Sequence, residues 1–83
     1  MSDFNNFNDN VQIYDNQVST LIDEVSTTEF YIGNSNGAKN TSAAIWKIKK
    51  IWQDGSVWNI GYPNGDQGFK FIWDDRDGAY TYL

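Results

Sequence analysis

The sequence predicts a small, mainly β protein, an antiparallel meander of about five strands arranged as a sandwich or an open barrel. Three observations favour this fold class. Aromatic residues make up 17% of the chain, and proline occurs only once. Short runs of alternating apolar and polar residues recur, and most end in a cluster of Gly, Asn, Asp or Ser. Aromatic and β-branched side chains favour the half-buried surface of a sheet, and such clusters are typical of the turns between strands.

A chain of 83 residues is long enough for one domain. The distribution of charge divides this chain into two parts. Residues 1–30 carry six acidic and no basic side chains, whereas residues 31–83 carry six basic and five acidic ones. We predict an acidic N-terminal arm over residues 1–27, extended or with one short helix, and a compact antiparallel β domain over residues 28–83. With a net charge of −5, the chain lacks the excess of Lys and Arg that phosphate binding needs. Nucleic acid is therefore not an expected partner.

The beginning of the arm is too polar to fold by itself. It has neither the basic stretch nor the apolar run of a signal peptide, and no run in the chain has the length of a membrane span, so no membrane partner is expected. Apolar side chains nevertheless occur at Phe4, Phe7, Val11 and Ile13. Because a purely solvated tail has no use for them, we predict that they anchor the arm to a partner protein.

Strand signals become clear from residue 28. Residues 28–32 alternate between apolar and polar side chains, and a loop rich in Gly, Asn and Ser follows over residues 33–40. The strongest strand pattern covers residues 44–52. The doubled Lys49-Lys50 interrupts its alternation, so we predict a β-bulge that returns Ile51 to the buried face.

Turn signals separate the remaining strands. Asp54-Gly55 predicts a hairpin turn, after which residues 57–62 return antiparallel to the preceding strand. A second turn is expected at residues 63–66, a further strand at 69–73, a break at 74–78 and a last short strand at 79–83. The alternation assigns Trp46 and Trp58 to the core.

The residue types present limit the chemistry. The chain contains no Cys and no His, which removes thiolates and imidazoles as nucleophiles, bases or metal ligands. Residues 74–78, Asp-Asp-Arg-Asp-Gly, lack the remaining ligands of a calcium loop, so we interpret them as a solvated turn in which Arg76 pairs with one Asp. No feature of the sequence sets two carboxylates across a cleft. We expect no enzymatic activity, no cofactor and no metal site.

Three groups of side chains are candidates for the surface of the domain. Trp52 and Tyr62 are predicted to be an exposed aromatic pair that forms, with Tyr31, a lateral contact surface. An alternative is a sugar-binding platform of Trp52, Tyr62 and Asp66, on which a sugar ring would stack. A basic stripe on the outward face of the sheet would protect the sheet against edge-to-edge pairing, and it would consist of Lys47, Lys49, Lys50 and Lys70.

Several ordered motifs run through residues 28–83. They are Tyr-Ile-Gly at residues 31–33, Thr-Ser-Ala-Ala-Ile-Trp-Lys-Ile-Lys-Lys-Ile at residues 41–51 and Trp-Asp-Asp-Arg at residues 73–76, before an end that contains Tyr. In this order they resemble a small domain of virion-structure proteins in tailed bacteriophages. The departures lie in turns, at residues 64–66, at residue 75 and after Gly33, and the arm is not part of the resemblance.

The resemblance implies a non-enzymatic structural component of a phage particle, located in the virion. Such a protein would decorate the capsid, carry a head fibre or belong to the neck or tail, as a homo-oligomer or in many copies. Its arm would bind other virion proteins. A small domain without disulfides or metal also favours assembly, which supplies stability that a small core lacks. Two alternatives remain: a carbohydrate-binding module for host attachment, and a small inhibitor of a host enzyme.

Overall fold

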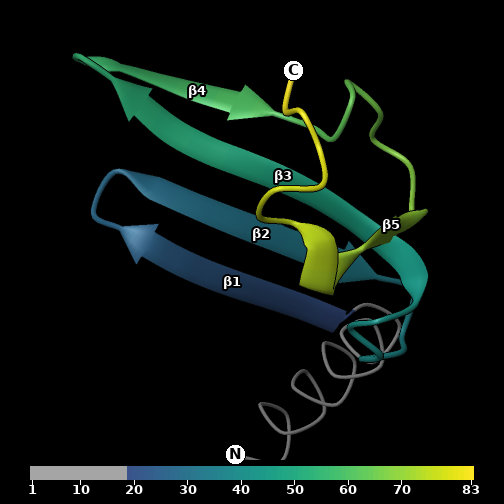
Figure 1. The fold of residues 1–83 in the computed structure, drawn as a ribbon. Helices are drawn as coiled ribbons and strands as arrows, with labels where there is room; N and C mark the ends of the chain where they lie inside the picture. The colour runs from purple at the N-terminus through teal and green to yellow at the C-terminus, as the bar shows by residue number, and fades with distance from the viewer. Residues whose placement is uncertain (1–18) are drawn as a thin grey trace, which may run out of the picture.

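The computed structural model describes residues 19–83, which form one antiparallel sheet (Figure 1). Its strands are β1 (Ser19–Ser26), β2 (Glu29–Ser35), β3 (Ala44–Asp54), β4 (Val57–Gly61) and β5 (Phe71–Ile72), and the 3-10 turn η1 (Trp73–Asp75) follows β5. The first four strands lie in sequence order, and β5 pairs with the beginning of β3. The predicted mainly β fold, an antiparallel meander, is confirmed.

The sheet begins before the predicted boundary of the β domain at residue 28. β1 pairs with β2 from Ser19 opposite Ser35 to Ser26 opposite Glu29. Residues 19–26 are therefore extended, as one of the two readings of the arm expected, but they belong to the sheet. The reason is long-range: Leu21 packs against the core and Asp23 pairs with Arg76. The predicted anchors Phe4, Phe7, Val11 and Ile13 lie outside the described residues.

Both predicted turns are confirmed. β3 and β4 form a hairpin in which Asp54 pairs with Val57, and Gly55 between them has a φ of +65°. At the second turn, Asn64 and Gly65 have φ values of 53° and 76°, and the Gly65 N–H donates to the Tyr62 carbonyl at 3.0 Å. The last predicted strand is reduced to one bridge, between Tyr82 and Pro63.

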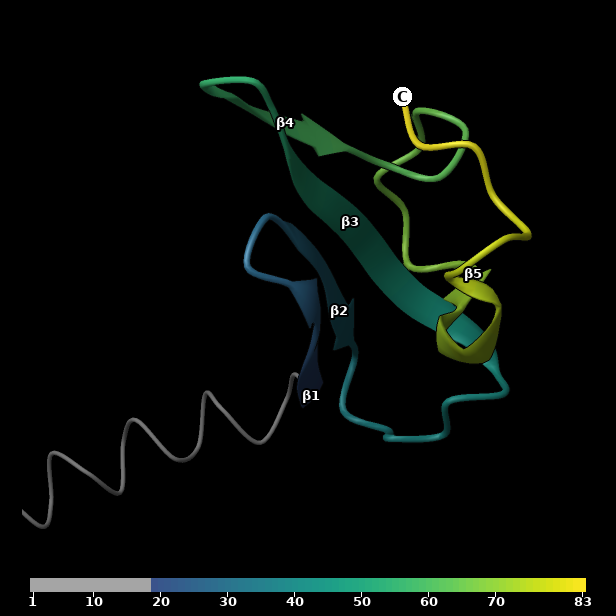
Figure 2. The same ribbon diagram turned by 60° about the vertical axis from the view of Figure 1, so that its left-hand side comes forward.

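The segment after β5, residues 73–83, crosses one face of the sheet, which we call the covered face (Figures 1 and 2). Trp73 lies on Trp46 with ring centroids 5.9 Å apart, and Tyr82 lies on Tyr31 at 5.5 Å. Trp46 is fully buried and its indole Nε1 donates to the Asn40 carbonyl at 2.9 Å, so its predicted place in the core is confirmed. The buried apolar residues are Tyr31, Trp46, Ile48, Phe71 and Trp73.

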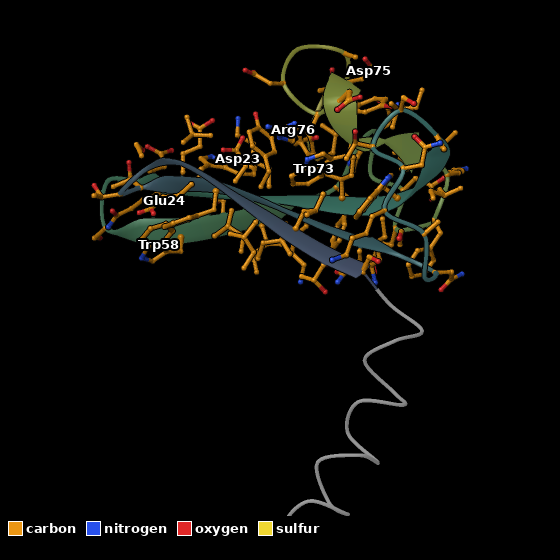
Figure 3. All side chains as sticks on the ribbon, turned by 90° about the horizontal axis from the view of Figure 1, so that it is seen from below. Asp23, Glu24, Trp58, Trp73, Asp75 and Arg76 are labelled. Atoms are coloured by element: carbon orange, nitrogen blue, oxygen red, sulfur yellow. The ribbon has the colours of Figure 1, made fainter. Side chains whose placement is uncertain are left out.

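Arg76 fastens this segment to β1. Its Nε and Nη2 donate to Asp23 Oδ2 at 3.0 and 2.9 Å, and its Nη1 donates to the Trp73 carbonyl at 3.1 Å. The guanidinium also lies 4.5 Å from the centre of the Trp73 ring, a cation–π contact. Figure 3 shows Arg76, Asp23 and Trp73 together on the covered face. The prediction that Arg76 pairs with an Asp of its own run is therefore wrong, because its partner lies on the distant strand β1.

The predicted β-bulge at Lys49-Lys50 is absent from β3. β3 pairs residue for residue with β2, from Trp46 opposite Ser35 to Trp52 opposite Glu29, without a register shift. Lys50 consequently points to the covered face. Its Nζ lies 3.6 Å from Glu29 Oε2, and 5.7, 5.5 and 5.9 Å from ring centroids that belong to Tyr31, Trp52 and Tyr82. Rings and a carboxylate compensate for the charge, so the strand needs no phase shift, and Ile51 points to the opposite face.

Candidate functional site

The face of the sheet opposite the C-terminal segment, which we call the open face, carries no cover among the described residues. The strand register defines its side chains: Ile22 lies opposite Ile32, and Phe30 lies opposite Ile51, which lies opposite Ile60. Two residues before Ile60, Trp58 points the same way, and its ring lies 6.2 Å from that of Phe30. We call these six side chains the apolar patch: Ile22, Phe30, Ile32, Ile51, Trp58 and Ile60.

Half of the apolar patch is strongly exposed. Ile22 is 67% exposed, Ile60 58% and Trp58 48%. Figure 3 shows Trp58 and Glu24 on the side of the sheet opposite Trp73 and Arg76. The assignment of Trp58 to the core is therefore wrong. A contiguous apolar patch that spans four strands is typical of a surface that binds another polypeptide or ligand.

The charged side chains of the open face flank the apolar patch. On β3, Lys47 and Lys49 point to the open face, because they alternate with the buried Trp46 and Ile48. Neither lysine takes part in an ion pair with residues 19–83. On β1, Glu24 lies opposite Phe30. The face therefore has a basic end beside the apolar patch.

The predicted basic stripe of four lysines is not formed. Lys47 and Lys49 share the open face, but Lys50 lies among rings on the covered face. Lys70 is remote from β3 in sequence and forms an ion pair with Asp66. Only Lys47 and Lys49 remain as a basic pair.

The predicted lateral surface of Tyr31, Trp52 and Tyr62 is mostly withdrawn from solvent. Tyr31 is only 3% exposed and belongs to the core. Trp52 is half-buried on the covered face, where a side chain at Gly61 would meet its ring at 3.1 Å. Tyr62 is half-buried, and its backbone exchanges two hydrogen bonds with Leu83, at 2.9 and 3.0 Å. Of these three residues, Tyr31 cannot contact a partner in this conformation.

The predicted sugar platform would also use Asp66, whose carboxylate is already engaged. It pairs with Lys70 and accepts a hydrogen bond from the Gly68 N–H at 2.8 Å. The hydrogen bond from Lys70, together with that from Gly68, lowers the pKa of Asp66 below its ordinary value. The Asp66 carboxylate thus stabilises its own turn and is not directed at a ligand.

Residues 19–83 show no enclosed site for a small molecule. They form no pocket, and they contain no cluster of three or more acidic side chains that could hold a metal ion. Within the same residues, no helix has the length and apolarity required to cross a membrane. The surface to explain is therefore the apolar patch with its two flanking lysines.

No family model, no curated protein and no solved structure matches this chain. The candidate site accordingly rests on the geometry of the open face.

The places of Trp58, Ile60 and Ile51 on the open face differ from those that the sequence pattern predicted. The hairpin turn at Asp54-Gly55 places Ile51 opposite Ile60, so these side chains must share a face. With unbroken alternation in β3, that face is the one opposite Trp46 and Ile48. The turn and the alternation together therefore indicate that Ile51, Trp58 and Ile60 lie on the open face. The predicted bulge at Lys49-Lys50 led to the opposite assignment.

Proposed function

We propose that this protein is a non-enzymatic structural component of a tailed-phage particle, and that it binds a neighbouring particle protein through the apolar patch. The observation that carries the proposal is the patch itself, six apolar side chains across four strands, left without a cover by residues 19–83. The motif resemblance of residues 28–83 supports the phage particle as the setting. The protein would accordingly reside in the virion in multiple copies.

The charges of the open face indicate the chemistry of the partner. Lys47 and Lys49 flank the apolar patch and have no described counter-ion. A complementary surface would therefore present apolar side chains with acidic residues at one side, since complementary charges orient partners and favour the correct register. The partner's aromatic or aliphatic side chains would pack on Trp58 and Ile60.

Particle incorporation tests this proposal. We expect mass spectrometry of purified particles to find the chain in stoichiometric amounts. The double variant Trp58→Ser/Ile60→Ser should reduce its incorporation by about tenfold or more, because exposed aromatic anchors dominate the binding energy of interfaces.

A matched control is Phe69→Ser, which removes an aromatic side chain that is 44% exposed and lies outside the apolar patch. This variant should be incorporated normally. The proposal fails if the chain is missing from the particles, or if the double variant is incorporated as well as the control.

A further inference from the structure

We infer that the outer edge of β4 pairs with the same edge of a second copy of this chain, so that two sheets join into one. The inference goes beyond the proposed function, which concerns the open face and leaves the strand edges unassigned. β4 lies at one end of the strand order, and none of the residues 19–83 pairs with its outer edge between Val57 and Gly61 (Figure 1). Such an edge offers unpaired N–H and C=O groups to another strand.

The free backbone groups of this edge belong to Trp58 and Ile60. In β3, the Gln53 N–H donates to the Thr28 carbonyl at 3.0 Å, on the side of β2 and away from β4. Gln53 lies opposite Trp58, so these two residues form a pair without mutual hydrogen bonds, and the backbone groups of Trp58 point away from β3. Because this direction alternates along a strand, the groups of Ile60 point outward as well.

One register uses all of these groups. If Trp58 of one copy lies opposite Ile60 of the other, the two residues exchange both hydrogen bonds, and the twofold symmetry of the dimer repeats the pair. A shift in one direction would require Tyr62, whose N–H and carbonyl already bond to Leu83 at 2.9 and 3.0 Å. A shift in the other direction would require Ser56, which belongs to the hairpin turn.

The side chains of β4 also fit this pairing. Opposite residues of an antiparallel pair share a face, so each Trp58 would lie beside an Ile60 of the other copy on the open face. Both side chains are strongly exposed in the single chain. Contacts between aromatic and β-branched side chains stabilise neighbouring strands. The two apolar patches thereby become continuous, which doubles the surface that the proposed function offers to a particle protein.

Charge favours a second β4 over β1 as the partner strand. β4 contains neither a charged residue nor a proline, so two copies meet there without like charges. β1 carries Asp23 and Glu24, and its pairing with β2 is irregular between Glu24 and Ser26. Charged side chains and bulges of this kind protect a strand edge against pairing. β4 is the edge without this protection.

Asn59 provides the test, because in this register it lies opposite Asn59 of the second copy. Its side chain points to the covered face, since it alternates with Trp58 and Ile60 of the apolar patch. Asn59→Lys and Asn59→Asp should each raise the dissociation constant of the dimer about fivefold or more, because like charges directly opposite each other repel. A mixture of the two variants should restore dimers that contain one chain of each kind. Analytical ultracentrifugation over a series of concentrations measures the constants, and native mass spectrometry identifies the mixed dimer.

The matched control is Val25→Lys, which adds a charge to the other edge strand, β1, at a side chain that is 52% exposed. This variant should leave the dimer unchanged. Dissociation by Val25→Lys and not by Asn59→Lys would assign the contact to β1 and overturn the inference. A chain that is monomeric at every concentration, or equal dissociation constants for all variants, would overturn it as well.

Amide hydrogen exchange tests the backbone contacts directly. In the dimer the N–H groups of Trp58 and Ile60 should exchange slowly, whereas in Asn59→Lys they should exchange fast. The N–H groups of Asn59 and Gly61 point to β3 and should stay protected in both proteins, which reports that the hairpin is folded. Fast exchange at Trp58 and Ile60 in the dimer would contradict the inferred register.

The dimer and the proposed function can fail separately. Trp58 and Ile60 take part in both, so the separating variant is Ile22→Ser, on β1 at the far end of the apolar patch. This variant should lower incorporation into particles and leave the dimer intact. A monomeric chain whose incorporation still depends on Ile22 would refute the dimer alone. A dimer that is missing from the particles would refute the proposed function alone.

Discussion

At Gly33 the C-terminal segment lies closer to the sheet than a side chain would allow. A Cβ atom at this position would lie 2.5 Å from Cε3 of Trp73 and 3.1 Å from Cε3 of Trp46. The two indole rings are packed on each other in the core, so neither has free space to move into. The missing side chain of Gly33 is what allows the Trp73 ring to lie this close to β2.

We predict that Gly33→Ala destabilises the protein by about 1–3 kcal/mol, the usual range for overpacking a core. The measurement is the free energy of unfolding in urea. The matched control is Gly68→Ala, whose Cβ would meet the Asp66 carboxylate at 3.1 Å and the Lys70 side chain at 3.7 Å, both at the surface and not in the core. A Gly33→Ala variant as stable as the control would show that the Trp73 ring can shift.

Tyr82 and Tyr31 make the stability of the protein depend on pH in the alkaline range. Burial is the main reason why the pKa of each phenol lies above its ordinary value. The carboxylates of Asp77 and Glu29 raise the pKa of Tyr31 further, and the neighbouring phenols of Tyr31 and Tyr80 raise that of Tyr82. Below pH of about 10, both phenols are neutral in the folded and unfolded states, and their contribution to stability is fully present. Above this pH the unfolded chain ionises first, so stability is lost as the pH rises towards the folded pKa values.

We therefore expect the free energy of unfolding to be constant around neutral pH and to fall above pH of about 10. Urea unfolding at a series of pH values measures this. In Tyr82→Phe the fall should be shallower, although the variant is less stable at neutral pH because it loses the hydrogen bond from Tyr82 Oη to the Arg76 carbonyl. An unchanged alkaline slope in Tyr82→Phe would show that other groups cause the fall.

At the scale of elements, the C-terminal segment is held at its end by backbone hydrogen bonds between residues 62–64 and residues 81–83, and nearer its start by the side chain of Arg76. Only Tyr82 forms a bridge, with Pro63, whereas Arg76 links Asp23 on β1 to the backbone of η1. Both members of this ion pair are partly shielded from water, with 24% of the Arg76 side chain and 33% of the Asp23 side chain exposed. The pair is therefore stronger than a fully exposed one.

Asp23→Asn should cost about 1–2 kcal/mol of stability, because the variant loses the charge that accepts two hydrogen bonds from Arg76. Thermal unfolding measures the change. Asp75→Asn serves as the control, since Asp75 is exposed and forms no ion pair within residues 19–83, and it should change stability by less than about 0.5 kcal/mol. Equal losses in both variants would mean that general charge, and not this pair, matters.

The elements also show how far the sequence could lead. The turns at Asp54-Gly55 and residues 63–66 depend on local residue types, and these predictions are confirmed. β1 and the C-terminal segment depend on contacts between residues far apart in the sequence, such as Asp23 with Arg76. The predictions for these two segments therefore differ from the structure: residues 79–83 were predicted to be a strand, and residues 19–26 were predicted to be part of the arm. The alternation in β3 predicts two faces, but it could not show that the rings of Tyr31, Trp52 and Tyr82 would surround Lys50 on the covered face.

At the scale of the whole molecule, residues 19–83 form one sheet and cover one of its faces themselves, which makes a thin core. Its buried apolar residues are few, and Trp46 is the largest of them that is fully buried. A domain of this size has a free energy of unfolding of only a few kcal/mol. Truncation of one buried side chain therefore removes most of this stability. Within residues 19–83 the open face contributes less to folding, because half of its apolar patch, Ile22, Trp58 and Ile60, is strongly exposed.

Trp46→Ala and Trp58→Ala should therefore differ sharply. We expect Trp46→Ala to cost about 3–5 kcal/mol and to unfold the domain at room temperature. Trp58→Ala should leave a cooperative melting transition within a few degrees of the unchanged chain. Circular dichroism during heating measures both, and a stable Trp46→Ala variant would refute the assignment of the two faces.

The opposite orientation of Lys49 and Lys50 has a practical consequence for chemistry on this protein. These neighbours in sequence should react differently with an amine-acylating reagent, because Lys50 Nζ is held between the Glu29 carboxylate and aromatic rings while Lys49 is not. Mass spectrometry can measure the labelling rates of the two amines in one sample, so that Lys49 serves as the internal reference for Lys50. Labelling of Lys50 at the rate of Lys49 would report that Lys50 has left its contacts with Glu29 and with the rings of Tyr31, Trp52 and Tyr82, without any probe attached to the chain.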